Sequence, residues 1–397
     1  MKKFICYFVV LLVVFSGCIL SSCAGFGSKD VPDTFEQKIG FDSVPKVIDF
    51  TKGWQQTIYG NYFFFLDHSQ PKYQKLNGSE KEILPVYSDP LAENTESPFA
   101  ALGAISFIAI DTAASAENKG VPVLIVGGDY FESIETPSGR RELFESRIGS
   151  YNMATGEFKL LKTGLQGSLM SLTIYKDRVL FCVATTDSGW NLHSIRAKDG
   201  QDEKIMQNPD QNFYRLFCVA EDRIYYWRED QGILCSCDLS FENTQELFPI
   251  ELVPEMFIYN DRIYYATNRK TNEEKQYSCF DICYRSLSQI SKEETLLKNV
   301  TVGMNFENYF YYYSADNIVT SGNNIDPLGG KTLYCIDITT GKTKIIYDKE
   351  DTSLLNCYTA LGEDYVIYQA RDPVSGKANV FCIQLDTKEE FSLIKSF

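Results

Sequence analysis

The chain has two histidines, His68 and His193, and they set a narrow limit on its chemistry. His68 follows Asp67, and a carboxylate beside an imidazole could act as an acid/base pair. A solvated pair at the end of a strand is the simpler interpretation of this dipeptide. Two histidines also supply little material for a Ser-His-Asp triad or a histidine-rich metal site. The histidines therefore do not predict a catalytic centre.

Nine cysteines follow Cys23, and none of their spacings gives the Cys-x-x-Cys pairs of a zinc site. Cys335 and Cys382 occupy a position of a repeated strand where other repeats have serine. Those serines are Ser150, Ser194 and Ser236. The position therefore favours a small side chain, and we expect cysteine there to be a small core residue. We predict no metal and no cofactor, while disulfides elsewhere in an exported chain stay open.

Acidic residues outnumber basic ones by 53 to 38, which gives a net charge of -15. Such a field repels phosphate backbones, so nucleic acid is excluded as a partner. The abundant carboxylates could include two opposed acids in a central pocket, the arrangement that glycoside hydrolysis needs. The sequence does not select such a pair.

The N-terminus has the layout of a bacterial secretory signal. Lys2 and Lys3 precede an apolar run of 12 residues, 4–15, which is shorter than the about 20 that a bilayer span needs. The segment Leu20-Ser-Ser-Cys23 then resembles the lipobox of bacterial lipoproteins. This resemblance implies cleavage before Cys23 and diacylation of its sulfur. Cys18 is an alternative site, but a bulky Phe15 stands where the pattern prefers Leu or Val.

These features predict an exported protein that is lipid-anchored to the bacterial cell envelope. We expect a signal peptide over 1–22, a tether over 23–44 and one folded domain over 45–397. The membrane is then a partner through the lipid on Cys23 rather than through basic residues.

Six segments of the chain share an apolar approach, a two-residue turn and an aromatic or β-branched run. The second turn residue is always Asn or Asp, at Asn61, Asp177, Asp222, Asp261, Asn308 and Asp364. Tight hairpin turns need positive φ, which Asn and Asp tolerate best after Gly. The column therefore predicts six β-hairpins.

Successive members of this column from Asp177 onward are 45, 39, 47 and 56 residues apart, whereas Asn61 and Asp177 are 116 apart. One degenerate repeat fits that gap, with its second strand at 121–126. A period near 40 to 45 with four strands is typical of β-propellers. The second strands, such as 262–265, are apolar on both faces, as a blade between two other blades requires. We predict an all-β fold, a β-propeller of seven four-stranded blades.

The run Arg223-Ile-Tyr-Tyr-Trp227 and its relatives resemble the YWTD propeller repeats of the low-density lipoprotein receptor family, over most of 54–397. Among the repeats, only this one has tryptophan at this position of the motif, which departs from the family pattern. The resemblance implies the fold, and such propellers serve many functions. The turns at 337–342 and 152–157 similarly resemble docking turns of quinoprotein-like propellers, but they lack the tryptophan. A quinone-dependent dehydrogenase is therefore a weaker alternative.

Strand alternation predicts that the short hairpins lie on one face of the propeller and the variable loops on the other. These loops are expected at 185–190, 268–277, 314–330 and 371–377, with insertions near 90–119 and 134–141. Loops on a rigid scaffold commonly carry recognition. The candidate ligand-binding residues, all expected to be exposed on this face, are Trp190, Trp227, Arg269, Tyr277, Asp316, Asn324 and Arg371.

The sequence contains an anchor and repeats but no catalytic motif. Our leading hypothesis is a non-catalytic binding or assembly module for protein or glycan ligands at the cell envelope. The alternative is an extracellular carbohydrate-active enzyme, a hydrolase or lyase, with paired carboxylates in the central funnel. Whether the protein is an enzyme thus stays open, with binding favoured.

Overall fold

The computed structural model describes most of the chain from Pro45 onward. The described residues are 45–46, 50–53, 55–76, 82–87, 97–136, 139–185, 189–207, 217–228, 231–250, 256–272, 277–315, 331–349, 355–371 and 378–394. Two units are distinguished, Met1–Gly40 and Phe41–Phe397, and all of these residues lie in the second. Within them, no helix has the length and apolar character needed to cross a membrane.

The described strands follow one another in groups of four, which form blades 1 to 7 in chain order. Blade 1 contains β2 (Gln56–Tyr59), β3 (Tyr62–Asp67), β4 (Gln70–Lys75) and β5 (Ile83–Pro85). Blade 2 contains β6 (Ala104–Ile110), β7 (Val123–Thr136), β8 (Gly139–Asn152) and β9 (Glu157–Leu165), with η1 (Pro98–Leu102) before β6 and α3 (Thr112–Glu117) after it. Blade 3 contains β10 (Ser168–Tyr175), β11 (Arg178–Thr185), β12 (Gly189–Arg196) and β13 (Lys204–Met206).

The remaining blades follow the same order. Blade 4 contains β14 (Phe217–Ala220), β15 (Arg223–Arg228), β16 (Ile233–Asp238) and β17 (Gln245–Pro249). Blade 5 contains β18 (Met256–Tyr259), β19 (Arg262–Asn272), β20 (Tyr277–Ser286) and the first part of β21 (Gln289–Phe306). Blade 6 contains the rest of β21, β22 (Tyr309–Ser314), β23 (Thr332–Asp337) and β24 (Lys342–Asp348). Blade 7 contains β25 (Leu355–Leu361), β26 (Tyr365–Arg371), β27 (Ala378–Gln384) and β28 (Glu390–Ile394).

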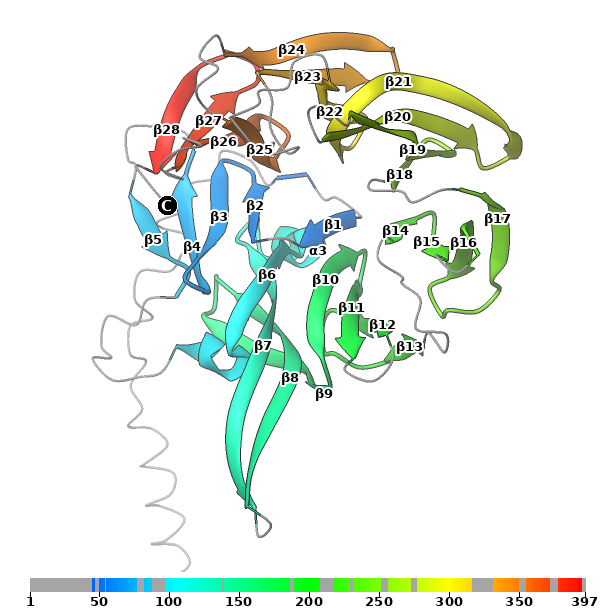
Figure 1. Ribbon diagram of the computed structural model, residues 1–397. Coiled ribbons are helices and arrows are strands. Elements are labelled where there is room, and N and C mark those ends of the chain that lie inside the picture. Colours follow the sequence, from blue (N-terminus) through cyan, green and yellow to red (C-terminus); the bar gives the residue numbers. More distant parts are fainter. Residues whose placement is uncertain are drawn as a thin grey trace, which may run out of the picture. The chain divides into compact units, whose positions relative to one another are not determined.

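The blades are antiparallel sheets arranged around a centre, with their first strands innermost (Figure 1). Strand β21 serves two blades, because residues 289–300 pair with β20 and residues 300–306 pair with β22. The inner strand β2 contacts both β6 and β25, which brings the first and last blades together. The chain is therefore a seven-bladed β-propeller, as the sequence predicts.

The second strand of each blade supplies much of the core. Residues 224–227 of β15 and 310–313 of β22 are consecutive buried residues, so both faces of these strands are covered. One apolar cluster includes Tyr225 of blade 4, Tyr264 of blade 5 and Phe310 of blade 6. This packing explains the two-sided apolar pattern, since each blade lies between two others.

The Asn/Asp column lies in the turns between first and second strands, as predicted, but its conformation varies. Asp222 and Asp261 have positive φ together with the residue before them. In three other turns the preceding residue alone takes positive φ, namely Gly60, Lys176 and Glu307. The expectation that the Asn or Asp itself needs positive φ is therefore wrong for those turns, which have the backbone of a type II′ rather than a type I′ hairpin.

A second feature is common to five of the six Asn and Asp residues in these turns. The backbone carbonyl of each accepts a hydrogen bond from the N–H at the start of the turn between the third and fourth strands of its blade. The five pairs are Leu76 to Asn61, Ala197 to Asp177, Leu287 to Asp261, Ile338 to Asn308 and Leu385 to Asp364, with N to O distances of 2.7 to 2.9 Å. These bonds hold both sets of turns on one side of the ring. We call this side the hairpin face, and the side with the other connections the loop face.

The small third-strand position has two forms. Ser194 accepts a hydrogen bond from Arg178 at 2.9 Å, whereas Cys335 lies opposite Tyr311 in a blade whose second strand begins with Tyr309. Cys335 and Cys382 are fully buried, and the eight cysteines whose side chains are described, which do not include Cys357, are free thiols. Ser194 and Ser236 thus each accompany an arginine, Arg178 and Arg223. Cys335 and Cys382 instead belong to apolar clusters. The prediction that these cysteines are small core residues is confirmed.

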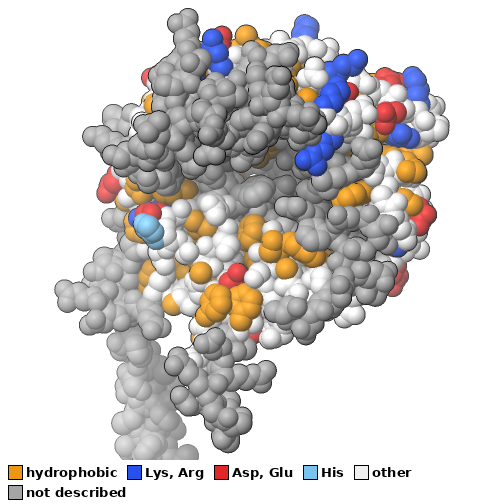
Figure 2. All heavy atoms as spheres, in the orientation of Figure 1, with side chains coloured by type: hydrophobic (Ala, Val, Ile, Leu, Met, Phe, Trp, Pro, Cys, Tyr) orange, Lys and Arg blue, Asp and Glu red, His pale blue; other side chains and the backbone are white. Residues whose placement is uncertain are grey.

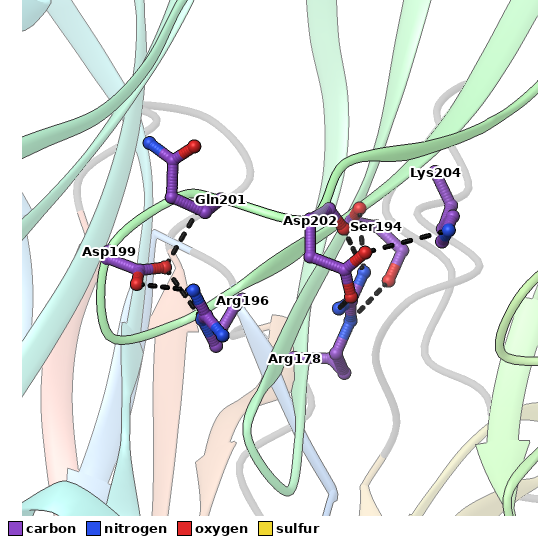
Figure 3. Close-up of polar contacts among 7 residues, drawn as sticks. All are labelled: Arg178, Ser194, Arg196, Asp199, Gln201, Asp202 and Lys204. Atoms are coloured by element: carbon purple, nitrogen blue, oxygen red, sulfur yellow. Dashed lines mark hydrogen bonds and ion pairs between the residues drawn. The ribbon is translucent and has the colours of Figure 1, made fainter.

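Arg178 fixes the third-to-fourth-strand turn of blade 3 (Figure 3). Its Nη1 lies 2.7 Å from Asp202 Oδ2, and its Nη2 donates to the backbone oxygens of Ser194 and Asp202 at 3.0 and 2.8 Å. In the same turn, Arg196 donates two hydrogen bonds to Asp199 and thereby lowers the pKa of that carboxyl to about 2. These contacts are confined to blade 3 and have a structural role.

Two predicted insertions have a different structure from the one expected. The region 90–119 is not a single loop, because it contains η1, β6 and α3. The region 134–141 is the end of a two-stranded ribbon, since β7 and β8 pair from Val123↔Asn152 to Thr136↔Gly139. Figure 1 shows this ribbon extending beyond the other blades. We call residues 130–145, which lie past the last pairing with β6, the arm.

Strand β1 (Phe50–Gly53) does not belong to a blade of its own. It pairs antiparallel with β10, the innermost strand of blade 3, and so lies at the centre of the ring (Figure 1). A Cβ on Gly53 would lie 2.9 Å from Leu172 Cδ2 and 3.3 Å from Ala109 Cβ. Glycine therefore allows β1 to approach the inner strands of blades 2 and 3 closely.

The ring closes between blades 1 and 7 without exchange of strands among the described residues. Each of these two blades is built from four consecutive strands. Buried side chains of both blades form one cluster, which includes Phe63 of β3 and Ile367 of β26. Gln74 Nε2 also donates to Leu393 O at 3.1 Å. Packing and a few polar contacts therefore join the two ends of the ring.

Candidate ligand site

A pocket of about 550 Å³ lies between blades 4 and 5 on the loop face. It is an open hollow rather than an enclosed cavity, and its volume falls in the range of about 300 to 1,000 Å³ that small ligands occupy. The lining residues come from both blades and are Trp227, Gly232, Pro249, Ile250, Tyr265, Thr267, Asn268 and Glu293.

The blade 4 wall is apolar. Trp227, at the end of the second strand β15, is 6% exposed, and its Nε1 donates to Ile250 O at 3.2 Å. The backbone N–H of Ile250 donates in turn to Gly232 O at 2.7 Å. Gly232 has a φ of 61°, which glycine adopts without strain. The indole, Ile250 and the glycine turn therefore form one rigid wall.

The blade 5 wall is polar at its rim. A bulge in β19 separates Thr267 from Lys270, and Asn268 within it has a φ of 53°. Asparagine tolerates this left-handed conformation better than most residues. The bulge places the half-buried Thr267 and the exposed Asn268 on the pocket, where a hydroxyl and an amide are available to a ligand.

The floor of the pocket contains a hydrogen-bonded group of three side chains. Tyr265 donates to Glu293 Oε2 at 2.5 Å and accepts from Arg285 Nε at 2.7 Å. Arg285 also lies 3.2 Å from Glu293 Oε2 and stacks over Phe248. Burial and the hydrogen bond to Glu293 raise the pKa of Tyr265, so the phenol stays protonated at neutral pH. This phenol is suited to hydrogen bonding rather than to nucleophilic attack.

A buried carboxylate supports the rim from behind. Asp281 accepts from Asn268 Nδ2 at 3.2 Å, from the Asn299 N–H at 3.2 Å and from Lys270 Nζ at 3.3 Å. Burial alone would disfavour its charge, but these hydrogen bonds keep the pKa of Asp281 below its usual value. Asp281 therefore stays ionised and orients the Asn268 amide beside the pocket.

The predicted site residues that the structure describes lie in four different blades. Trp227 is one of the pocket-lining residues, but it is buried rather than exposed as expected. Trp190 is half-buried at the start of β12 in blade 3, and Arg269 is exposed beside Asn268. Tyr277 and Arg371 lie at the ends of β20 and β26, with only their backbones described. Asp316, Asn324 and Cys23 lie outside the described residues.

The other titratable side chains considered for catalysis have structural roles or are exposed to solvent. His68 is fully exposed, with its Nε2 3.8 Å from Asp67 Oδ1. Asp67 forms its ion pair with Lys72 instead, and that hydrogen bond lowers the pKa of Asp67. Asp111 has a pKa raised by burial, but its carboxylate accepts from the Ala114 N–H and caps α3. The Asp67–His68 dipeptide is thus a solvated pair.

His193 forms a more buried cluster that the sequence did not single out. Its Nδ1 lies 3.1 Å from Glu203 Oε1, its ring stacks on Phe181, and Lys162 lies 2.5 Å from the other oxygen of Glu203. Burial lowers the pKa of His193, although Glu203 opposes this effect. The imidazole is therefore neutral in the folded protein at pH 7.

Stability is expected to fall as the pH drops from 7 through the ordinary histidine value near 6.5. In this window the unfolded chain takes up a proton at residue 193 that the folded chain resists, so acid favours unfolding. Melting temperatures between pH 7.5 and 5.5 test this expectation. His193→Gln should flatten the slope, and His68→Gln, which changes the exposed histidine, should leave it unchanged. An equal slope in His193→Gln would contradict the assignment.

The surface is mixed in character rather than uniformly apolar. Figure 2 shows hydrophobic side chains in small groups over the lower half of this view and lysine and arginine side chains toward its upper right. Phe131 on the arm is 69% exposed and contacts Phe144 of the opposite strand, with ring centroids 4.6 Å apart. Small groups of exposed apolar side chains of this kind are ordinary on protein surfaces.

The fold and the interblade pocket define a seven-bladed β-propeller with a candidate ligand site on its loop face. The structure is similar to the β-propeller domain of the Trilobed protease from Pyrococcus furiosus, which has an open velcro topology. That comparison has a TM-score of 0.49 at 11% identity and covers 87% of this chain and 98% of the other. It is also similar to an oligogalacturonate lyase in complex with manganese, with a TM-score of 0.42 at 9% identity over 68% of this chain and 73% of the other. No protein-family model and no curated protein matches the sequence.

Proposed function

We propose that the chain is a lipid-anchored, extracytoplasmic binding module that holds a glycan between blades 4 and 5. The pocket itself carries the proposal, because it combines an apolar wall with a polar rim. Sugars present C–H faces that pack on apolar side chains and hydroxyls that bond to amides, hydroxyls and carboxylates. Trp227 and Ile250 supply the first kind of surface, and Thr267, Asn268 and Glu293 supply the second.

The rigidity of the pocket also supports this function. Trp227 and Tyr265 are both hydrogen-bonded and buried, and Asp281 orients Asn268. A wall that is already ordered loses little conformational entropy when a ligand binds. Strand β1 pairs with the innermost strand of blade 3, so its backbone takes up part of the centre of the ring.

Loss of the rim amide is expected to weaken glycan binding about tenfold, the effect of one hydrogen bond. The variant Asn268→Gly removes the amide and keeps the positive φ. Its matched control is Asn260→Gly, which has a φ of 49° in the same blade but lies in the turn between β18 and β19 on the hairpin face. Binding is measured by an oligosaccharide array followed by calorimetry.

A second variant, Thr267→Trp, fills the pocket and should abolish binding. Equal affinity of wild type and both pocket variants for every array ligand would contradict the site. Capture of an envelope protein in place of any glycan would favour a protein ligand. Release of shortened or unsaturated sugars during incubation would favour a hydrolase or lyase instead of a binding module.

The anchor belongs to the same proposal and rests on the lipobox-like segment that ends at Cys23. The variant Cys23→Ala should move the protein from the membrane fraction to the soluble fraction and stop incorporation of labelled fatty acid. Cys18→Ala is the control and should do neither. The reverse pattern would assign lipidation to Cys18, and labelling of both variants would contradict both sites.

A further inference from the structure

The chain enters the ring from the hairpin face. Phe50, at the start of β1, pairs with Tyr175, which directly precedes the turn between β10 and β11 on that face. Gly53, at the end of β1, pairs with Leu172, farther along β10 toward the loop face. Strand β1 therefore runs from the hairpin face toward the loop face.

A second contact places the preceding residues on the same side. Lys46 Nζ lies 2.5 Å from Glu307 Oε1. Glu307 has a φ of 50° in the turn between β21 and β22, so it belongs to the hairpin face of blade 6. Lys46 thus forms an ion pair with blade 6, and Phe50 pairs with blade 3. Both contacts place the N-terminal approach to the ring on the hairpin face.

The ligand pocket and the arm both lie on the opposite side. Gly232 is in the connection between β15 and β16, and Ile250 follows the last strand of blade 4. The arm is the connection between the second and third strands of blade 2. Both features therefore lie on the loop face, away from the point where the chain enters.

We infer that the hairpin face is the membrane-facing surface of the propeller and that the loop face is presented away from the bilayer. This inference rests on the proposed anchor at Cys23, from which residues 24–49 lead to β1. Attachment at the hairpin face leaves the pocket and the arm accessible to ligands outside the membrane.

The test uses two exposed positions of blade 4 on opposite faces. Ser240 lies in the turn between β16 and β17 on the hairpin face, and Gln231 lies in the turn between β15 and β16 on the loop face. The six residues of β16 between them span about 20 Å. Lipidated Ser240→Cys and Gln231→Cys proteins are labelled with a donor dye and inserted from detergent into preformed vesicles that carry a headgroup-linked acceptor dye.

Energy transfer to the lipid acceptor is expected to be several-fold more efficient from the Ser240→Cys protein. The eight native cysteines whose side chains are described are buried, and labelled wild type gives the background from all native cysteines. Equal transfer from both variants, or greater transfer from Gln231→Cys, would overturn the orientation. Flotation of the vesicles separates this result from failure of the anchor: a chain that does not float with them overturns the anchor, and the orientation with it.

Discussion

Replacing Phe63 with alanine is expected to destabilise the propeller by about 3 to 5 kcal/mol, the cost of a large cavity in a packed core. Phe63 is fully buried where blade 1 meets blade 7, in one cluster with Ile367 and Val380. No described strand crosses this junction, so packing there has to hold the ends of the ring together. The loss should therefore open the ring locally.

Hydrogen exchange measured by mass spectrometry separates this local opening from general destabilisation. In Phe63→Ala, exchange should rise first in β2 to β5 and β25 to β28. The matched control is Phe181→Ala, which removes an equally buried phenylalanine from blade 3. Its exchange should rise around β10 to β13 instead. The same pattern in both variants would show that the junction between the first and last blades is no weaker than the others.

Gly303→Ala is the second substitution with a large expected effect. A Cβ at this position would lie 2.0 Å from Cζ of Phe310 and 2.7 Å from its Cε1. Phe310 is fully buried and stacks on Phe257 at 5.5 Å, so its ring cannot move without disturbing blade 5. Overpacking of this kind typically costs about 1 to 3 kcal/mol, and we expect the upper end here.

A double-mutant cycle with Phe310→Leu tests the assigned cause. If the aromatic ring is the obstacle, Gly303→Ala should cost much less in the Phe310→Leu background than in the wild type. Thermal unfolding of the four proteins supplies the comparison. An unchanged cost would place the effect of Gly303→Ala in the backbone of β21 rather than in its contact with Phe310.

The binding and anchoring proposals assign different parts of the chain to different tasks. The pocket between blades 4 and 5 would recognise the ligand, and Cys23 would hold the protein at the membrane. Strand β1 ties the N-terminal segment to the ring, because it pairs with the innermost strand of blade 3. Variants of Asn268 and Cys23 therefore should have separable effects, on affinity and on location respectively.

The sequence predicted the fold well because the signals for it are local. A turn such as Asn260-Asp261 specifies a hairpin with two residues, and a run such as Ile263-Tyr-Tyr265 specifies a strand covered on both faces. Six repetitions of these signals, together with one degenerate repeat, leave few architectures other than a ring of blades. The arm was missed because its strands, from Tyr130 to Glu145, alternate less clearly and lack the tight turn of the column.

The sequence by itself determined the seven-bladed propeller and the shared side of its short hairpins, and it indicated Trp227 as a candidate ligand-binding residue. Only the tertiary structure showed that Trp227 is buried against Ile250 and that Tyr265 and Glu293 complete the pocket with it. The physical reason is that a strand is specified by neighbouring residues, whereas this pocket lies between two blades. Its walls come from side chains up to 66 positions apart, from Trp227 to Glu293, which meet only when the blades pack.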